Sequence, residues 1–107
     1  MTFEISLDFK ISVHTINSVN ITFDTAKDAA NLSKHGVSLA LAQQLEWEWL
    51  RAKSDTRMNY EEPRMIGYAP IGERVYCVVF VDRGAVRRII SLRKANTREV
   101  NRYVEQT

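Results

Sequence analysis

The stretch Val86-Arg87-Arg88-Ile89-Ile90-Ser91-Leu92-Arg93-Lys94-Ala95, followed by Asn96-Thr97-Arg98-Glu99, decides the fold predicted for this chain. Its apolar residues can anchor a strand, while its cations remain available to a ligand. Asn96 with Glu99 three residues later has the spacing of a capping box, which predicts that the strand turns directly into a helix. A polyanion is the natural partner of such a cationic element, and solvated cations without any partner are the alternative.

Two more strands are predicted immediately before this stretch. Residues 64–71 and 75–82 are rich in apolar and β-branched side chains, and glycine-containing turns around Gly72 and Gly84 separate the three segments. Residues 75–81 are apolar on both faces, which is typical of a central strand. The sequence therefore predicts an antiparallel three-stranded unit with residues 75–82 in the middle.

The first half of the chain predicts a hairpin and two helices. Residues 3–13 alternate strictly between apolar and polar side chains, and residues 19–23 resume this alternation after a turn around His14. A helix capped by Asp24 or Thr25 should then run over residues 26–35 and stop at Gly36, and Ser38 should cap a second helix over residues 39–46. The segment Trp47-Glu48-Trp49-Leu50 either prolongs that helix or begins the next strand. The predicted fold class is α+β, with an antiparallel sheet and helices gathered on one side.

Composition and charge restrict the class of protein. With 107 residues and 26% charged residues, the chain has the size and composition of one soluble domain, residues 1–107. Its single cysteine, Cys77, excludes a disulfide framework and suits a reducing cytoplasm, and we expect neither a membrane span nor a signal peptide. Residues 83–107 contain seven cations and two acids, a net charge of +5, whereas residues 1–82 have a net charge of −3. This asymmetry favours a binding surface for an anionic partner.

Three blocks of residues resemble one protein family. The first comprises Phe23, Asp24, Lys27, Asn31, Lys34, His35, Gly36, Val37 and Ala42. The second comprises Asp55, Arg57, Tyr60, Glu62, Arg64 and Gly67, and the third comprises residues 88–95 with Glu99 and Tyr103. Together they resemble the BrnT toxins of bacterial type II toxin–antitoxin modules over residues 21–105. Phe23, Glu61 and Leu92 depart from the tryptophan, glycine and alanine usual there, and residues 1–20 lie outside the pattern.

The resemblance implies a RelE-like ribonuclease fold, here with an additional N-terminal strand. It also implies a cytoplasmic enzyme that cleaves RNA and so inhibits translation. The implied partner is a ribbon-helix-helix antitoxin, BrnA-like, which neutralises the toxin in a hetero-oligomer. Operator DNA is contacted only through that antitoxin.

Metal-independent RNA cleavage needs a base for the 2′-hydroxyl, cations for the phosphorane charge and an acid for the leaving 5′-oxygen. The candidate catalytic residues are His35, Glu62, Arg64, Arg93 and Tyr103. The candidate RNA-binding residues are Lys34, Arg57, Arg87, Arg88 and Lys94. The sequence contains no recognised spacing of metal ligands and no phosphate-binding glycine loop, so we expect neither a metal nor a cofactor.

Each candidate also has a structural alternative. Arg64 and Arg93 could form salt bridges with Glu62 or Glu99, and His35 could serve as a cap or core residue. Tyr103 could be a core tyrosine. At the level of the whole protein, the alternatives are a module that binds nucleic acid or an antitoxin without catalysis, and a toxin fold retained only as an interaction subunit. Catalysis requires Arg64, Arg93 and His35 to converge on one cleft, whereas binding requires only a broad basic stripe.

Overall fold

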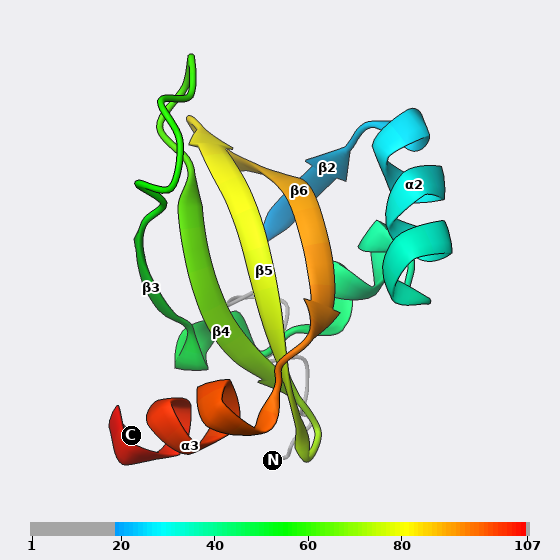
Figure 1. Cartoon of the computed structure of the whole chain (residues 1–107). Helices are drawn as coiled ribbons and strands as arrows, with labels where there is room; N and C mark the ends of the chain where they lie inside the picture. The colour runs from blue at the N-terminus through cyan, green and yellow to red at the C-terminus, as the bar shows by residue number, and fades with distance from the viewer. Residues whose placement is uncertain (1–18, 107) are drawn as a thin grey trace, which may run out of the picture.

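The computed structural model describes residues 19–106, which form a five-stranded sheet with helices at its edges (Figure 1). In sheet order the strands are β2 (Asn20–Phe23), β6 (Val86–Lys94), β5 (Arg74–Arg83), β4 (Met65–Ile71) and β3 (Arg51–Ser54). The helices are α2 (Thr25–His35) and α3 (Thr97–Gln106), with 3-10 helices η1 (Leu39–Gln44) and η2 (Trp47–Trp49) between α2 and β3. Within the described residues, no helix is long and apolar enough to span a membrane.

The three strands predicted from the sequence are confirmed as β4, β5 and β6. They pair antiparallel with β5 in the centre, and β5 is buried on both faces from Val75 to Val81. Gly72 and Gly84 occupy the connecting turns with φ of 59° each, a left-handed conformation that costs glycine little. The capping box is also present, because the Glu99 N–H donates to Asn96 Oδ1 and the Asn96 N–H donates to Glu99 Oε1, both at 2.8 Å.

The prediction of a purely antiparallel sheet is wrong, because β2 runs parallel to β6. A parallel neighbour requires a long connection rather than a hairpin, and here the chain between β2 and β6 supplies it. The sheet is therefore mixed. The predicted hairpin, the additional N-terminal strand over residues 3–13 and His14 lie outside the described residues.

The helices are not gathered on one side of the sheet. Figure 1 shows α2 beside the β6 edge and α3 at the opposite end, beneath β3 and β4. The second predicted helix is the short 3-10 helix η1, and the tryptophan segment forms η2 instead of prolonging a helix or starting a strand. These short turns place Trp47 against the sheet, where its ring meets the Phe80 ring edge-on at 5.8 Å and its indole N–H donates to the Ala42 carbonyl.

One face of the sheet packs against η1 and η2. The buried core consists of Leu39, Ala42, Leu45, Trp47, Ala69, Tyr76, Val78, Phe80, Ile89 and Leu92. Because side chains alternate along a strand, the residues between these core positions point to the other face. We call that other face, which holds Tyr68, Cys77 and Arg93, the site face.

Helix α2 is fixed to the sheet by a side chain that substitutes for a strand. The buried Asn31 amide donates to the Leu92 carbonyl at 2.8 Å and accepts from the Leu92 N–H at 3.1 Å. Strand β2 pairs with β6 only from Val86 to Ile89, so the edge at Leu92 would otherwise lack these bonds. Asp24 caps the start of α2 and Gly36, with φ of 77°, ends it. Asn31 therefore has a structural role, since its side chain joins α2 to β6.

Candidate functional site

Strand register brings polar side chains from distant parts of the sequence into one row on the site face. Arg51 lies opposite Tyr68, Tyr68 opposite Cys77, and Cys77 opposite Arg93. Side chains directly opposite one another on neighbouring strands point to the same face. This row therefore crosses four strands and leads from the β3 edge to the β6 edge.

Arg93 forms a paired contact with Glu99 at the start of α3. Its two terminal nitrogens each donate to one Glu99 oxygen at 2.9 Å, and the Tyr68 hydroxyl donates to the same carboxylate at 3.1 Å. The hydrogen bond from Arg93 is the main cause that lowers the pKa of Glu99 to about 2. The salt bridge between Arg93 and Glu99, which was the alternative for Arg93, is thus present, and it joins α3 to the sheet.

A hollow of about 240 Å³ lies between β3, β4 and α3 next to this contact. Its lining residues are Arg51, Ala52, Lys53, Ile66, Tyr68, Glu99, Arg102, Tyr103 and Gln106. We call it the Tyr68 hollow. Tyr103 is buried and its hydroxyl donates to the Trp49 carbonyl at 2.6 Å, which matches its alternative as a core tyrosine.

The loop between β3 and β4 is organised by the buried carboxylate of Asp55. Arg57 donates to it twice, at 2.8 and 2.7 Å, and the Tyr60 hydroxyl donates at 3.1 Å. The Arg57 bond holds the pKa of Asp55 well below its usual range, while the Arg57 side chain itself is 61% exposed. The Arg64 guanidinium in turn lies 4.3 Å from the centre of the Tyr60 ring. Asp55 therefore positions Arg64 through Tyr60.

A second hollow, of about 360 Å³, gathers cations from four segments around a carboxylate. Its lining residues are Lys27, Tyr60, Glu61, Glu62, Arg64, Val81, Arg83, Arg88 and Ile90. We call it the Arg64 hollow. Glu62 accepts from Arg83, with an Nε–Oε2 distance of 2.9 Å, rather than from Arg64 as its alternative role required.

The positive charges of the Arg64 hollow keep Glu62 ionised. Its pKa is lowered, first by the hydrogen bond from Arg83 and further by the charges of Arg83, Arg88 and Arg64. Arg88 is also 3.8 Å from Asp24, the N-cap of α2. A cationic hollow with one ionised carboxylate can bind a phosphate and offer a base beside it.

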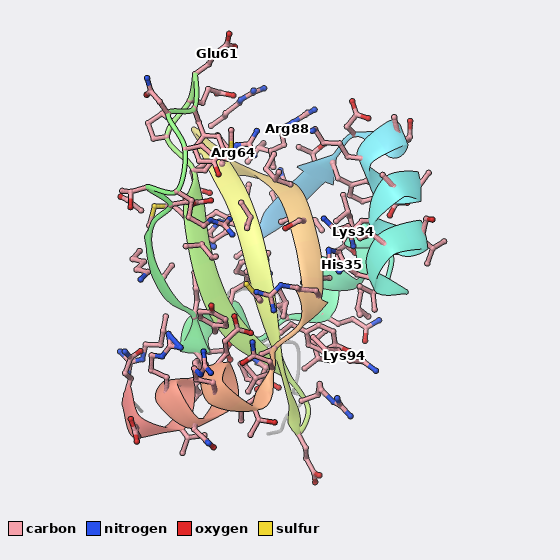
Figure 2. All side chains as sticks on the ribbon, viewed as in Figure 1. Lys34, His35, Glu61, Arg64, Arg88 and Lys94 are labelled. Carbon is pink, nitrogen blue, oxygen red and sulfur yellow. The ribbon has the colours of Figure 1, made fainter. Side chains whose placement is uncertain are left out.

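The α2 helix adds cations along the same side of the molecule. Lys27, Asn31, Lys34 and His35 share a helical face because their spacing is three to four residues, and Asn31 fixes that face against β6. In Figure 2, Lys34 and His35 lie between Arg88 and Lys94. Burial lowers the pKa of His35, and the charges of Lys34 and Arg93 lower it further, which favours the neutral imidazole.

Two predicted RNA-binding residues differ in their placement. Arg87 lies on the core face, with its guanidinium 4.8 Å from the Trp47 ring centre and 4.2 Å from the Phe80 ring centre, and it pairs with Asp82 at 2.7 Å. The Arg87 charge is thus used in contacts within the protein, and its role in RNA binding stays a prediction. Lys94, by contrast, is exposed at the end of β6.

Arg64 and Arg93 do not converge on one cleft. Arg64 lines the Arg64 hollow, whereas Arg93 is paired with Glu99 at the Tyr68 hollow. Arg64 and Tyr68 are separated by four residues, or about 13 Å of extended chain. Of these two arginines, Arg93 is the one whose charge lowers the pKa of the His35 imidazole. The predicted catalytic residues therefore form two clusters, and the single cleft that was expected to gather Arg64, Arg93 and His35 is not formed.

Several site residues were not found from the sequence. Arg51, Lys53 and Tyr68 line the Tyr68 hollow, and Arg83 holds Glu62 at the other. The available signal was the alternation of Arg51 with Lys53, which places both on one side of a strand, but the opposite strand and its register could not be inferred. Within residues 19–106, no group of three or more histidine, cysteine, aspartate or glutamate side chains is placed to hold a metal ion.

Comparison with known proteins identifies the family. A family model described as "Ribonuclease toxin, BrnT, of type II toxin-antitoxin system" matches residues 23–99, which is more than half of the chain. The matched segment contains Lys27, Glu62, Arg64 and Arg88 of the Arg64 hollow and extends to Glu99. A search of curated proteins found no match. The chain therefore belongs to the BrnT family of ribonuclease toxins of type II toxin–antitoxin systems.

Proposed function

We propose that this protein is an endoribonuclease that cleaves RNA at the Arg64 hollow without a metal ion. The observation that carries the proposal is the convergence of Lys27, Arg64, Arg83 and Arg88, from four segments, around the ionised carboxylate of Glu62. Such a hollow matches what cleavage requires, namely a base next to several cations.

In the proposed reaction Glu62 takes the proton of a 2′-hydroxyl. The oxygen attacks the adjacent phosphorus and forms a 2′,3′-cyclic phosphate, and the bond to the 5′-oxygen breaks. Arg64 and Arg88 stabilise the negative charge of the phosphorane, because a guanidinium stays charged and presents paired donors to phosphate oxygens. The Lys27 ammonium, on the same hollow, donates the proton to the leaving 5′-oxygen.

The remaining cations bind the RNA on either side of the cut. His35 is eight residues from Lys27, about 12 Å along α2, so we assign neither His35 nor Lys34 to the reacting phosphate. Lys34 binds a neighbouring phosphate by its charge, and His35, whose lowered pKa favours the neutral imidazole, contacts the RNA there by a hydrogen bond. The exposed guanidinium of Arg57 adds positive charge in the loop between β3 and β4. The Lys94 ammonium is exposed at the end of β6 but lies opposite the core residue Tyr76, on the other face of the sheet from Arg93. Arg93 and Tyr103 are assigned to positioning and packing, since their polar groups are bonded to Glu99 and to Trp49.

Membership of the toxin family supports a wider role for the cleavage reaction. We propose that the protein has a RelE-like fold and that its cleavage of RNA inhibits translation in the cytoplasm. A ribbon-helix-helix antitoxin of the BrnA type neutralises the enzyme in a hetero-oligomer and provides the contacts to operator DNA. Co-purification with the product of a neighbouring short reading frame tests this partner.

The cleavage proposal is tested with the purified full chain and a single-stranded RNA in the presence of a chelator. We expect cleavage to continue, with 2′,3′-cyclic phosphate ends visible by mass spectrometry. Glu62→Gln keeps the shape of the side chain but removes the base, so the rate should fall about 100-fold or more. The matched control is Arg98→Ala, which removes an exposed cation of α3 outside both hollows and should leave the rate within about twofold.

Three outcomes would overturn parts of this proposal. Loss of cleavage on chelation, restored by a divalent ion, would replace the metal-independent route. Full activity of Glu62→Gln would remove Glu62 from the role of base. RNA binding without any cleavage by the wild-type chain would identify a binding module instead.

A further inference from the structure

The Tyr68 hollow is distinct from the proposed cleavage site and has a different chemistry. Arg51 lies opposite Tyr68 in the β3–β4 register and Lys53 lies opposite Ile66, so all four side chains lie on the site face. Tyr103 and Arg102 of α3 line the same space from the other side. The hollow is thus formed by two strands and a helix from different parts of the sequence.

The walls of the Tyr68 hollow combine aromatic rings with cations. Tyr68 presents a partly exposed ring, Ile66 adds apolar surface and the buried Tyr103 closes the hollow from behind, while Arg51, Lys53 and Arg102 are exposed. The carboxylate in the wall, Glu99, already accepts bonds from Arg93, Tyr68 and the Asn96 N–H. Because Arg93 neutralises Glu99, the three exposed cations leave the hollow positive.

We propose that the Tyr68 hollow is a nucleotide-binding subsite, in which a base lies against the Tyr68 ring and its phosphate lies between Lys53, Arg51 and Arg102. Aromatic faces stack with any base, and a cationic rim binds the backbone, so this subsite binds single-stranded RNA with little sequence preference. The 240 Å³ of the hollow accommodates a flat ring partly enclosed by protein. An acidic protein segment would use the cations but not the Tyr68 ring, which favours the nucleotide.

The subsite would hold RNA while the adjacent part of the strand is cut. About 13 Å of extended chain separates Tyr68 from Arg64, and both hollows are lined by side chains of the site face, Tyr68 at one and Arg88 at the other. The inference rests on the proposed function for the identity of RNA as the ligand, yet binding can be measured without cleavage. A variant that abolishes cleavage therefore allows nucleotide binding at the Tyr68 hollow to be measured separately from RNA cleavage.

The test uses the full-length Glu62→Gln protein and adenosine 5′-monophosphate as the probe, with binding followed by titration calorimetry and by amide chemical shifts. Adenosine and inorganic phosphate serve as separate probes of the base and the phosphate. We expect Tyr68→Leu to weaken binding at least about fivefold, because a stacked base is lost. Tyr68→Phe retains the ring and should stay within about twofold of the parent.

The cationic rim is tested by Lys53→Ala combined with Arg102→Ala. We expect the double variant to bind adenosine 5′-monophosphate at least fivefold more weakly and to show a reduced dependence on salt. Arg98→Ala, on the same helix but outside the hollow, is the matched control and should bind as the parent does. Circular dichroism of each variant checks that it is folded.

Several results would overturn the proposal. Chemical shift changes confined to Lys27 and Arg88 would place the nucleotide in the Arg64 hollow. Binding of a glutamate-rich peptide that adenosine 5′-monophosphate does not displace would assign the Tyr68 hollow to a protein partner. Absence of nucleotide binding would also refute the proposed subsite. Absence of RNA cleavage by the wild-type chain, with nucleotide binding intact, would contradict the proposed function and leave the nucleotide subsite standing.

Discussion

Arg93→Ala removes the guanidinium that joins the last strand to the last helix. The pKa of Glu99 falls from 4.5 to about 2, mainly through this contact, and that difference corresponds to roughly 3 kcal/mol of stability. Solvent reduces the value, because 31% of the Arg93 side chain is exposed while only 12% of Glu99 is. We therefore expect the substitution to lower the free energy of unfolding by about 2 kcal/mol. The protein should stay folded at 25 °C.

The same contact predicts a dependence on pH. A carboxyl group with a lowered pKa stabilises the fold above its unfolded value of 4.5 and loses this effect as the pH falls toward 2. We expect Arg93→Ala to lose less stability than the wild type between pH 5 and pH 2. Urea denaturation followed by circular dichroism measures both quantities at each pH.

A double-mutant cycle with Glu99→Gln isolates the pair. The coupling energy between the two substitutions should be about 1.5 kcal/mol at pH 7, and Arg98→Ala should be nearly neutral as the exposed control. A change below about 0.5 kcal/mol for Arg93→Ala, or a coupling near zero, would show that α3 is held by other contacts. Loss of RNA cleavage by a fully stable Arg93→Ala protein would instead return Arg93 to the active site.

Three further substitutions test how the site is positioned. Asn31→Ala should cost about 2–3 kcal/mol, because it leaves the buried N–H and C=O of Leu92 unpaired, and hydrogen exchange at the Leu92 amide should accelerate. Gly67→Ala should destabilise the protein by about 1–3 kcal/mol, since a Cβ there would lie 2.8 Å from the Ala52 Cβ. Hydrogen exchange of the β3 amides, measured by NMR, should then accelerate. Equal stability of the variant and the wild type would refute this close approach. Asp55→Asn should cost about 2–3 kcal/mol in urea denaturation and slow RNA cleavage, and a slowed rate without any loss of stability would contradict its structural role.

Local features of the fold were predictable from the sequence. The cap of α2 at Asp24, its stop at Gly36 and the capping box of Asn96 and Glu99 all depend on residues within four positions of one another. The strands β4 to β6 were also predictable, because their apolar runs are separated by glycine turns. Such signals need no information about distant parts of the chain.

The pairing of distant segments was not predictable in this way. Strand β2 is parallel to β6, and the segment after Ser38 forms short 3-10 turns that bring Trp47 against Phe80 in the core. The contacts within the candidate site were likewise only partly predictable from the sequence. The pair Arg93 and Glu99 was one of the alternatives weighed from the sequence, whereas the partner of Glu62 proved to be Arg83 rather than Arg64.

The sequence by itself determined strands β4 to β6, helices α2 and α3, the family resemblance and the basic character of the last strand and helix. The tertiary structure decided how that charge is used: Arg87 packs on Trp47 and Phe80, Arg93 fixes α3 through Glu99, and Arg88 joins a hollow with Arg64. The physical reason is that a side chain's face follows from strand alternation, which is local, whereas its partner follows from register and helix placement, which the whole chain sets.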